Sequence, residues 1–158
     1  MSTLHNNVTL RAATDLDREF LISLFASTRQ QELAALGDDE ALKQLFVAMQ
    51  YDAQCRCYPE AENTIAVLNG TPIGRILIER NTNYLKLVDI ALLPEFRNKG
   101  IGSFLLERLL REAQKQDVPV TLHVFKSSDA VRLYERNGFQ STEDDGTYLA
   151  MQWRHLSN

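Results

Sequence analysis

One junction of the chain reads Leu92-Leu93-Pro94-Glu95-Phe96-Arg97-Asn98-Lys99-Gly100-Ile101-Gly102-Ser103. It joins an apolar segment to one with helical periodicity, and Pro94 ends the apolar strand because proline has no N–H for a ladder. The first N–H groups of a helix lack intrahelical acceptors, and the helix dipole places about half a positive charge beside them. Gly100 and Gly102 let an anion approach this backbone closely, since no Cβ intervenes. With Arg97 and Lys99 adding positive charge, the junction predicts a phosphate-binding turn.

Neither common nucleotide motif fits this turn. The Walker A pattern, G-x-x-x-x-G-K-[ST], is absent from the sequence. The dinucleotide pattern G-x-G-x-x-G is incomplete, because Leu105 stands where the third glycine belongs. A plain strand–helix turn with charged surface residues remains an alternative, since glycine pairs are common in turns.

Upstream of the junction the sequence predicts an antiparallel meander. Apolar segments at 64–68, 73–79 and 84–92 alternate with turn residues, and Asn69-Gly70 is a strong hairpin signal. A short strand at 8–11 and two helices are expected before them. The second of these helices is marked by apolar residues at helical spacing, namely Leu42, Leu45, Phe46 and Met49.

Downstream, a third helix and a strand at 118–125 complete a β-α-β unit, so this strand is expected to run parallel to 84–92. Ser127, Ser128 and Asp129 offer caps for a fourth helix, which ends at Asn137-Gly138. A terminal hairpin is expected around Asp144-Asp145-Gly146. The predicted order is β-α-α-β-β-β-α-β-α-β-β, an α/β domain with a mixed sheet.

The bulk properties favour a soluble, cytoplasmic protein of one domain. The chain has 158 residues, 44% of them hydrophobic and 24% charged, and a net charge of −4. That charge argues against broad nucleic-acid binding, and no apolar run approaches the roughly 20 residues of a membrane span. The N-terminal residues 1–11 lack the apolar segment of a signal peptide. Cys55 and Cys57 have no nearby Cys/His pair, so neither a disulfide nor a metal site is expected.

Two motifs resemble the GCN5-related N-acetyltransferase (GNAT) family. Arg97-x-x-Gly100-x-Gly102 is similar to its acetyl-CoA motif, Q/R-x-x-G-x-G/A. The stretch at 128–139 is similar to its second signature, N-x-A-x-x-L-Y-x-x-x-G-F. The resemblance implies a single domain over 1–158, with the first strand and acceptor-side helices at 8–62 and the acetyl-CoA-binding core and terminal hairpin at 64–158. It also implies an acyl-CoA N-acyltransferase fold, with a mostly antiparallel sheet of about seven strands and four helices.

The resemblance further implies acetyl-CoA as co-substrate. The pyrophosphate would be held by backbone amides, the pantetheine arm by strand main chain, and the thioester between two splayed strands. The implied cofactor-binding residues are Ile90, Ala91, Leu92, Arg97, Asn98, Lys99, Gly100, Ile101, Gly102, Ser103 and Ser128. Ser128 replaces the family asparagine, and a hydroxyl cannot supply both groups of an amide.

Transfer of an acetyl group to an amine needs a proton acceptor for the ammonium and a proton donor for the thiolate. Tyr134 matches the family tyrosine beside the sulfur, and a phenol of pKa about 10 can donate that proton. His123 is the candidate base, because strand alternation separates it from Leu122 and Val124 and imidazole titrates near neutrality. A water relay, with His123 in a structural role, is the alternative.

The acceptor amine is not identified by the sequence. The family builds the acceptor site from the N-terminal helices and the last hairpin, which here contain Arg29, Gln30, Glu32, Gln50, Tyr51, Gln54, Arg56, Tyr58 and the run Glu143-Asp144-Asp145. A non-catalytic acetyl-CoA sensor and, more weakly, a nucleotide-binding module are alternative functions. No nucleic-acid or membrane partner is expected, and a homodimer is left open.

Overall fold

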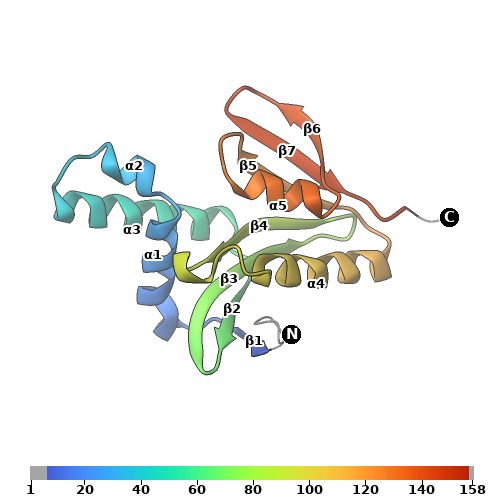
Figure 1. Ribbon diagram of the computed structural model, residues 1–158, viewed down its shortest axis with the longest axis horizontal. Coiled ribbons are helices and arrows are strands. Elements are labelled where there is room, and N and C mark those ends of the chain that lie inside the picture. The colour runs from blue at the N-terminus through green and yellow to red at the C-terminus, as the bar shows by residue number, and fades with distance from the viewer. Residues whose placement is uncertain (1–6, 157–158) are drawn as a thin grey trace.

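The structure, a computed structural model, describes residues 7–156. Its centre is one sheet of seven strands in the order β1-β2-β3-β4-β5-β7-β6 (Figure 1). Only β4 and β5 pair in parallel; the other neighbouring strands are antiparallel. The strands are β1 (Val8–Ala12), β2 (Glu62–Leu68), β3 (Thr71–Arg80), β4 (Leu85–Leu92), β5 (Val120–Phe125), β6 (Gln140–Asp144) and β7 (Tyr148–Trp153). The helices are α1 (Arg18–Ser27), α2 (Gln30–Ala34), α3 (Glu40–Cys57), α4 (Ile101–Gln116) and α5 (Ala130–Arg136). The predicted α/β architecture is confirmed, and α2 is a short helix beyond the four expected.

The β2–β3 hairpin turns at the predicted Asn-Gly pair. Asn69 and Gly70 have φ values of 51° and 83°, the left-handed conformation that a two-residue hairpin turn requires. Further along β3, Gly74 pairs with Leu92 of β4. A Cβ at Gly74 would lie 2.4 Å from the carbonyl oxygen of Ala91, so β3 and β4 pass too closely there for a side chain.

The parallel ladder between β4 and β5 is short. It pairs residues 85–87 with residues 120–122, although β4 runs on to Leu92 and β5 to Phe125. The register of β4 against β3 shifts at this point, so that Val88 is an extra residue in β4. Such a bulge bends a strand and increases its twist. The second half of β4 therefore has no strand partner on its β5 side.

Helices cover both faces of the sheet (Figure 1). Successive strand residues point to opposite faces, and the two hydrophobic clusters follow that rule: Ala66 belongs to the larger one and Ile65 to the smaller. The larger cluster includes the apolar stripe of α4 together with Tyr134 of α5. The smaller cluster holds Leu21 and Phe25 of α1 with Val47 and Tyr51 of α3.

The apolar stripe predicted for α3 does not pack into the core. Leu42, Leu45 and Met49 are 44%, 58% and 61% exposed, and α3 buries Val47 and Tyr51 instead. α2 and the first half of α3 extend beyond the edge of the sheet (Figure 1), so the stripe has no layer beneath it. The helix was predicted correctly, but its buried face was not, because helical spacing does not locate the surface against which a helix packs.

Glycines end α5 and turn the last hairpin as the sequence predicts. Gly138 has a φ of 95° directly after α5, and Gly146 has a φ of 93° between β6 and β7. Within residues 7–156, none of the helices is both long and apolar enough to cross a bilayer.

Candidate functional site

The turn between β4 and α4 presents backbone N–H groups. Asn98 and Gly100 have φ values of 61° and 84°, and Gly100 begins α4 without a side-chain cap. Across the described residues 7–156, the N–H groups of 98–103 donate to no protein acceptor. Asn98, Lys99 and Gly100 are exposed. This is the arrangement by which a helix start binds an anion.

The first residues of α4 contribute main chain rather than side chain to this turn. Ile101 is fully buried in the larger core, and Ser103 is half-buried. Gly102 faces α5: a Cβ there would lie 3.4 Å from Cδ2 of Leu133. The start of α4 therefore packs against the helix that carries Tyr134.

Arg97 points into the protein instead of adding charge at the rim of the turn. Its Nε donates to the Leu92 carbonyl at 2.9 Å, and its Nη2 donates to Ser27 Oγ at 3.2 Å. A weaker contact joins Nη2 to the Ser27 carbonyl at 3.4 Å. The guanidinium thus ties the end of β4 to the end of α1, and Lys99 is the exposed cation of the turn.

The last residues of β4, Ile90, Ala91 and Leu92, are those predicted to bind the pantetheine arm through their main chain. The N–H of Leu93 donates to Ile73 of β3 at 2.8 Å. Because successive residues of a strand direct their backbone groups to opposite sides, Ile90 and Leu92 direct theirs away from β3. The Leu92 carbonyl already accepts from Arg97, whereas the neighbouring β5 ladder has ended at residue 87.

Tyr134 is only 6% exposed, and the centre of its ring lies 5.7 Å from the centre of the Phe139 ring. Burial raises the pKa of its phenol well above the usual value, and the negative charge of Asp89 raises it further. Asp89 lies on β4 and Tyr134 on α5, so the interaction spans the region where β4 and β5 are unpaired. The phenol therefore keeps its proton throughout the neutral range.

The two remaining residues predicted for the site are His123, on β5, and Ser128, two residues before α5. Leu122 is buried and His123 is exposed, as strand alternation predicts. His123 pairs with Ala150 of β7 and does not line the pocket described below. Ser128 Oγ accepts the N–H of Ala130 at 3.1 Å, so its hydroxyl caps the start of α5.

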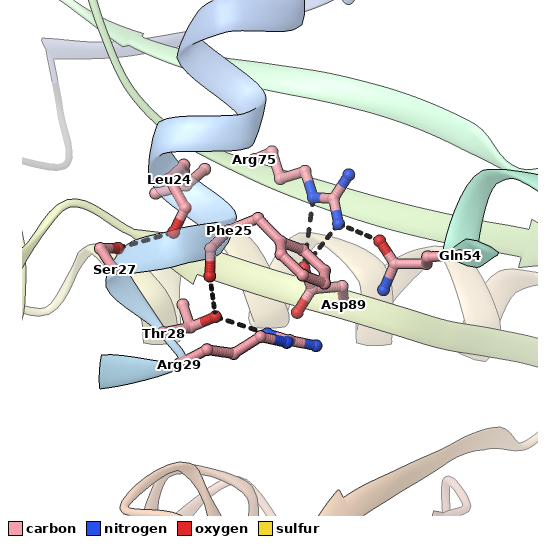
Figure 2. A network of polar contacts seen from close by, with 8 residues as sticks. All are labelled: Leu24, Phe25, Ser27, Thr28, Arg29, Gln54, Arg75 and Asp89. Carbon is pink, nitrogen blue, oxygen red and sulfur yellow. Dashed lines mark hydrogen bonds and ion pairs between the residues drawn. The ribbon is translucent and has the colours of Figure 1, made fainter. Parts of the chain in front are cut away.

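A buried polar network, which the sequence analysis did not anticipate, joins β3, β4 and α3 (Figure 2). Arg75 is 2% exposed, and its Nε and Nη2 donate to Asp89 Oδ2 at 3.2 and 2.8 Å. Nη2 also donates to Oε1 of Gln54. Oδ2 of Asp89 accepts both hydrogen bonds from Arg75, so Oδ1 can accept a hydrogen bond from another donor. One signal existed in the sequence: Arg75 interrupts the apolar run at 73–78, and Asp89 interrupts the apolar run at 87–92 on the adjacent strand.

A pocket of about 320 Å³ opens beside this network, between the N-terminal helices and the last strands. Its lining residues are Phe25, Arg29, Glu32, Gln50, Ala53, Gln54, Phe125 and Tyr148. Figure 2 shows Arg29, Gln54 and Arg75 gathered around Asp89. The rings of Phe125 and Tyr148 stack with their centres 4.4 Å apart and form an aromatic wall of the pocket.

The other residues predicted for the acceptor side divide between core and surface. Tyr51 packs edge-on against Phe25 at 5.9 Å, and Tyr58 lies under the ammonium of Lys86. Asp144 and Asp145 hold the terminal turn, because they accept N–H groups of residues 146–148. That acidic run therefore has a structural role.

The cysteines and acidic residues form no metal centre in the described part of the chain. Cys55 and Cys57 are free and exposed. No group of three or more His, Cys, Asp or Glu side chains among residues 7–156 is arranged to hold a metal ion.

Comparison with known proteins gives one family match and many structural neighbours. Residues 22–139 match the model of the acetyltransferase (GNAT) family. A 75-residue segment is 32% identical to the UPF0157 protein YqkA of Bacillus subtilis (strain 168), covering 48% of this chain and 22% of YqkA. The chain thus matches about a fifth of the length of that relative.

Two solved structures illustrate the likeness of fold. The PaiA N-acetyltransferase of Thermoplasma acidophilum, solved with coenzyme A, has a TM-score of 0.74 at 21% identity, over 98% of this chain and 100% of that one. A GNAT family acetyltransferase of Elizabethkingia anophelis, solved with acetyl-CoA, has a TM-score of 0.63 at 17% identity, over 95% of this chain and 99% of that one.

Proposed function

Because the chain belongs to the acetyltransferase (GNAT) family, we propose that it transfers the acetyl group of acetyl-CoA to an amine by direct attack in a ternary complex. One observation carries this proposal. The unpaired N–H groups of residues 98–103 begin α4 directly after the part of β4 that has no β5 partner. An anion-binding turn thus adjoins a free strand edge, as a pyrophosphate with an extended arm requires.

Two features of the chain fit acetyl-CoA. The turn at 98–103 offers unpaired N–H groups and the exposed ammonium of Lys99, which suit a pyrophosphate. The β4 edge at residues 90–92 lacks a strand partner on its β5 side and suits an extended, amide-containing arm. The coenzyme A and acetyl-CoA in the two solved relatives support the same assignment. In this proposal Arg97 acts by holding the turn, since its guanidinium is bonded to Leu92 and Ser27.

The chemistry needs three proton transfers around one substitution. The acceptor ammonium first loses a proton, which leaves to solvent. The neutral amine nitrogen then attacks the thioester carbonyl, the C–N bond forms, and the C–S bond breaks with release of the thiolate. Tyr134 gives its proton to that thiolate, and the tyrosinate takes up the second proton that the nitrogen loses after attack. The raised pKa keeps the phenol protonated at neutral pH but makes it a weaker acid, so donation requires the thiolate to form next to the hydroxyl.

Asp89 is the group best placed to receive the acceptor ammonium. Its Oδ1 is not used by Arg75, and the carboxylate lies close enough to both Tyr134 and Arg29 to affect their pKa values. We therefore assign orientation and deprotonation of the amine to Asp89. His123 is the competing assignment; neither it nor Asp89 is among the residues that line the pocket, but His123 is exposed, whereas Asp89 is partly buried.

Thiol release from acetyl-CoA, measured against a panel of amines, tests the function. Tyr134→Phe should lower kcat by at least about 100-fold, since a positioned general acid contributes 10²–10⁴-fold. Its affinity for acetyl-CoA should be unchanged, because only a hydroxyl is lost. Tyr84→Phe, in the loop before β4, is the matched control and should retain full activity. Equal losses of turnover and of acetyl-CoA affinity in Tyr134→Phe would contradict the acid role.

A further inference from the structure

Arg29 is a half-buried cation on the wall of the pocket. Its guanidinium carbon lies 3.6 Å from the centre of the Phe25 ring. Nη1 donates to Thr28 Oγ1 at 2.6 Å, and that hydroxyl donates in turn to the Phe25 carbonyl at 2.7 Å. Stacking and hydrogen bonding thus fix the orientation of the guanidinium (Figure 2).

Arg29 has no carboxylate partner among the described residues 7–156. By contrast, Arg11, Arg18, Arg75 and Arg80 each form an ion pair at 3.0 Å or less. Partial burial lowers the pKa of Arg29, and the charges of Asp89 and Glu32 oppose that shift without bonding to the guanidinium. A fixed cation with unused donors in a pocket is suited to a bound anion.

The charges of the pocket restrict which anion fits. Glu32 lines the same pocket and Asp89 lies behind it, so a doubly charged group would be repelled. A carboxylate carries one charge and matches the planar fork of arginine.

Resting on the proposed N-acetyltransferase function, we infer that the acceptor is a small amine carrying its own carboxylate, of the amino-acid class. Arg29 binds the carboxylate, and Asp89 faces the ammonium. The stacked Phe125 and Tyr148 rings form the wall along the rest of the molecule. Arg29 is thus a specificity-determining residue, while the reacting atoms remain with Tyr134 and Asp89.

Matched acceptors test this inference on the unmodified protein. Thiol release is measured with saturating acetyl-CoA for free amino acids, for the corresponding amino-acid amides and for polyamines such as spermidine. Each acid should exceed its amide in kcat/KM by about ten- to a hundredfold, as expected for a hydrogen bond to a charged group. The amide has the less basic amine, so it would react faster if the carboxylate were not recognised.

Arg29→Gln supplies the second arm. It should raise KM for the acids by a similar factor, leave kcat for the acids nearly unchanged, and leave kcat/KM for the amides unaffected. Arg111→Gln, an exposed position on α4, is the matched control and should behave like the wild type. An equal acetyl-CoA-induced thermal shift in both variants would verify that Arg29→Gln is folded.

The outcomes separate this inference from the proposed function. Acetylation of polyamines or amides with efficiency equal to that of the acids would overturn the acceptor class and leave the N-acetyltransferase function standing. If the Arg29→Gln variant still acetylates the acids in preference to their amides, the proposed role of Arg29 is overturned. Absence of transfer to every amine, despite binding of acetyl-CoA, would overturn both proposals.

Discussion

Asp89 stabilises the fold and is also the residue to which we assign the acceptor amine. Arg75 is 2% exposed, and a cation so buried needs a counter-charge because an unpaired buried ion is costly. Asp89 supplies that charge through Oδ2, and its own side chain is 24% exposed. The same charge helps to keep Tyr134 protonated. Replacement of Asp89 therefore affects the buried ion pair, the phenol and the proposed amine site together.

Asp89→Asn and His123→Ala distinguish the two candidate bases. Asp89→Asn should lower kcat/KM for the acceptor by at least about 100-fold, since it removes the charge that orients and deprotonates the amine. His123→Ala should change it less than about threefold, because the imidazole is exposed on β5 and takes no part in the polar network around Asp89. Steady-state kinetics at saturating acetyl-CoA would measure both.

Stability is the control for this comparison, because Asp89→Asn leaves the Arg75 charge uncompensated. Complete loss of a buried ion-pair partner costs about 3–5 kcal/mol. Urea unfolding should therefore show a destabilised but folded variant. The reverse kinetic pattern, with His123→Ala inactive and Asp89→Asn active, would assign the base to His123.

At the scale of elements, Arg97 connects three segments that are distant in the sequence. Its guanidinium joins the end of β4 at Leu92, the α4 turn that contains it, and the end of α1 at Ser27. Ser27 Oγ also donates to the Leu24 carbonyl at 2.6 Å, so α1 holds it in place. The turn before α4 and the end of α1 thus share one set of hydrogen bonds.

Ser27→Ala should weaken acetyl-CoA binding although Ser27 lies outside the turn. Loss of one hydrogen bond to Arg97, worth about 0.5–1.5 kcal/mol, predicts a two- to tenfold higher Kd by calorimetry. Ser23→Ala, an exposed position on the same helix, is the matched control. An unchanged Kd in Ser27→Ala would mean that the α1 contact does not position the turn.

At the scale of the whole molecule, α5 brings the two halves of the site together. Leu133 packs beside Gly102 at the start of α4, and the adjacent Tyr134 interacts with Asp89 on β4. A ligand that bridges the turn and the β4 edge would contact elements from both layers of the fold. Its binding should therefore stabilise the entire domain.

Acetyl-CoA at 100 times its Kd should stabilise the protein by about 2.7 kcal/mol. For a chain of this size the melting temperature should rise by about 5–11 °C in a thermal scan, at 2–4 °C per kcal/mol. Adenosine diphosphate offers the nucleoside and the pyrophosphate without the pantetheine arm and should give a smaller shift at the same concentration. Equal shifts for the two ligands would favour a nucleotide-binding module.

The sequence by itself determined the succession of strands along the chain, the Asn69-Gly70 hairpin and the α4 turn, because each depends on neighbouring residues with strong local preferences. It also indicated Tyr134, through a motif that is continuous along one helix. The Arg75–Asp89 network was decided by tertiary structure alone. Strict alternation would place Asp89 on the same face as Leu85 and Leu87, but the extra residue at Val88 turns it to the face of Arg75. The α3 surface that is buried and the direction of the Arg97 side chain likewise depend on distant partners, which only the packed chain brings within reach.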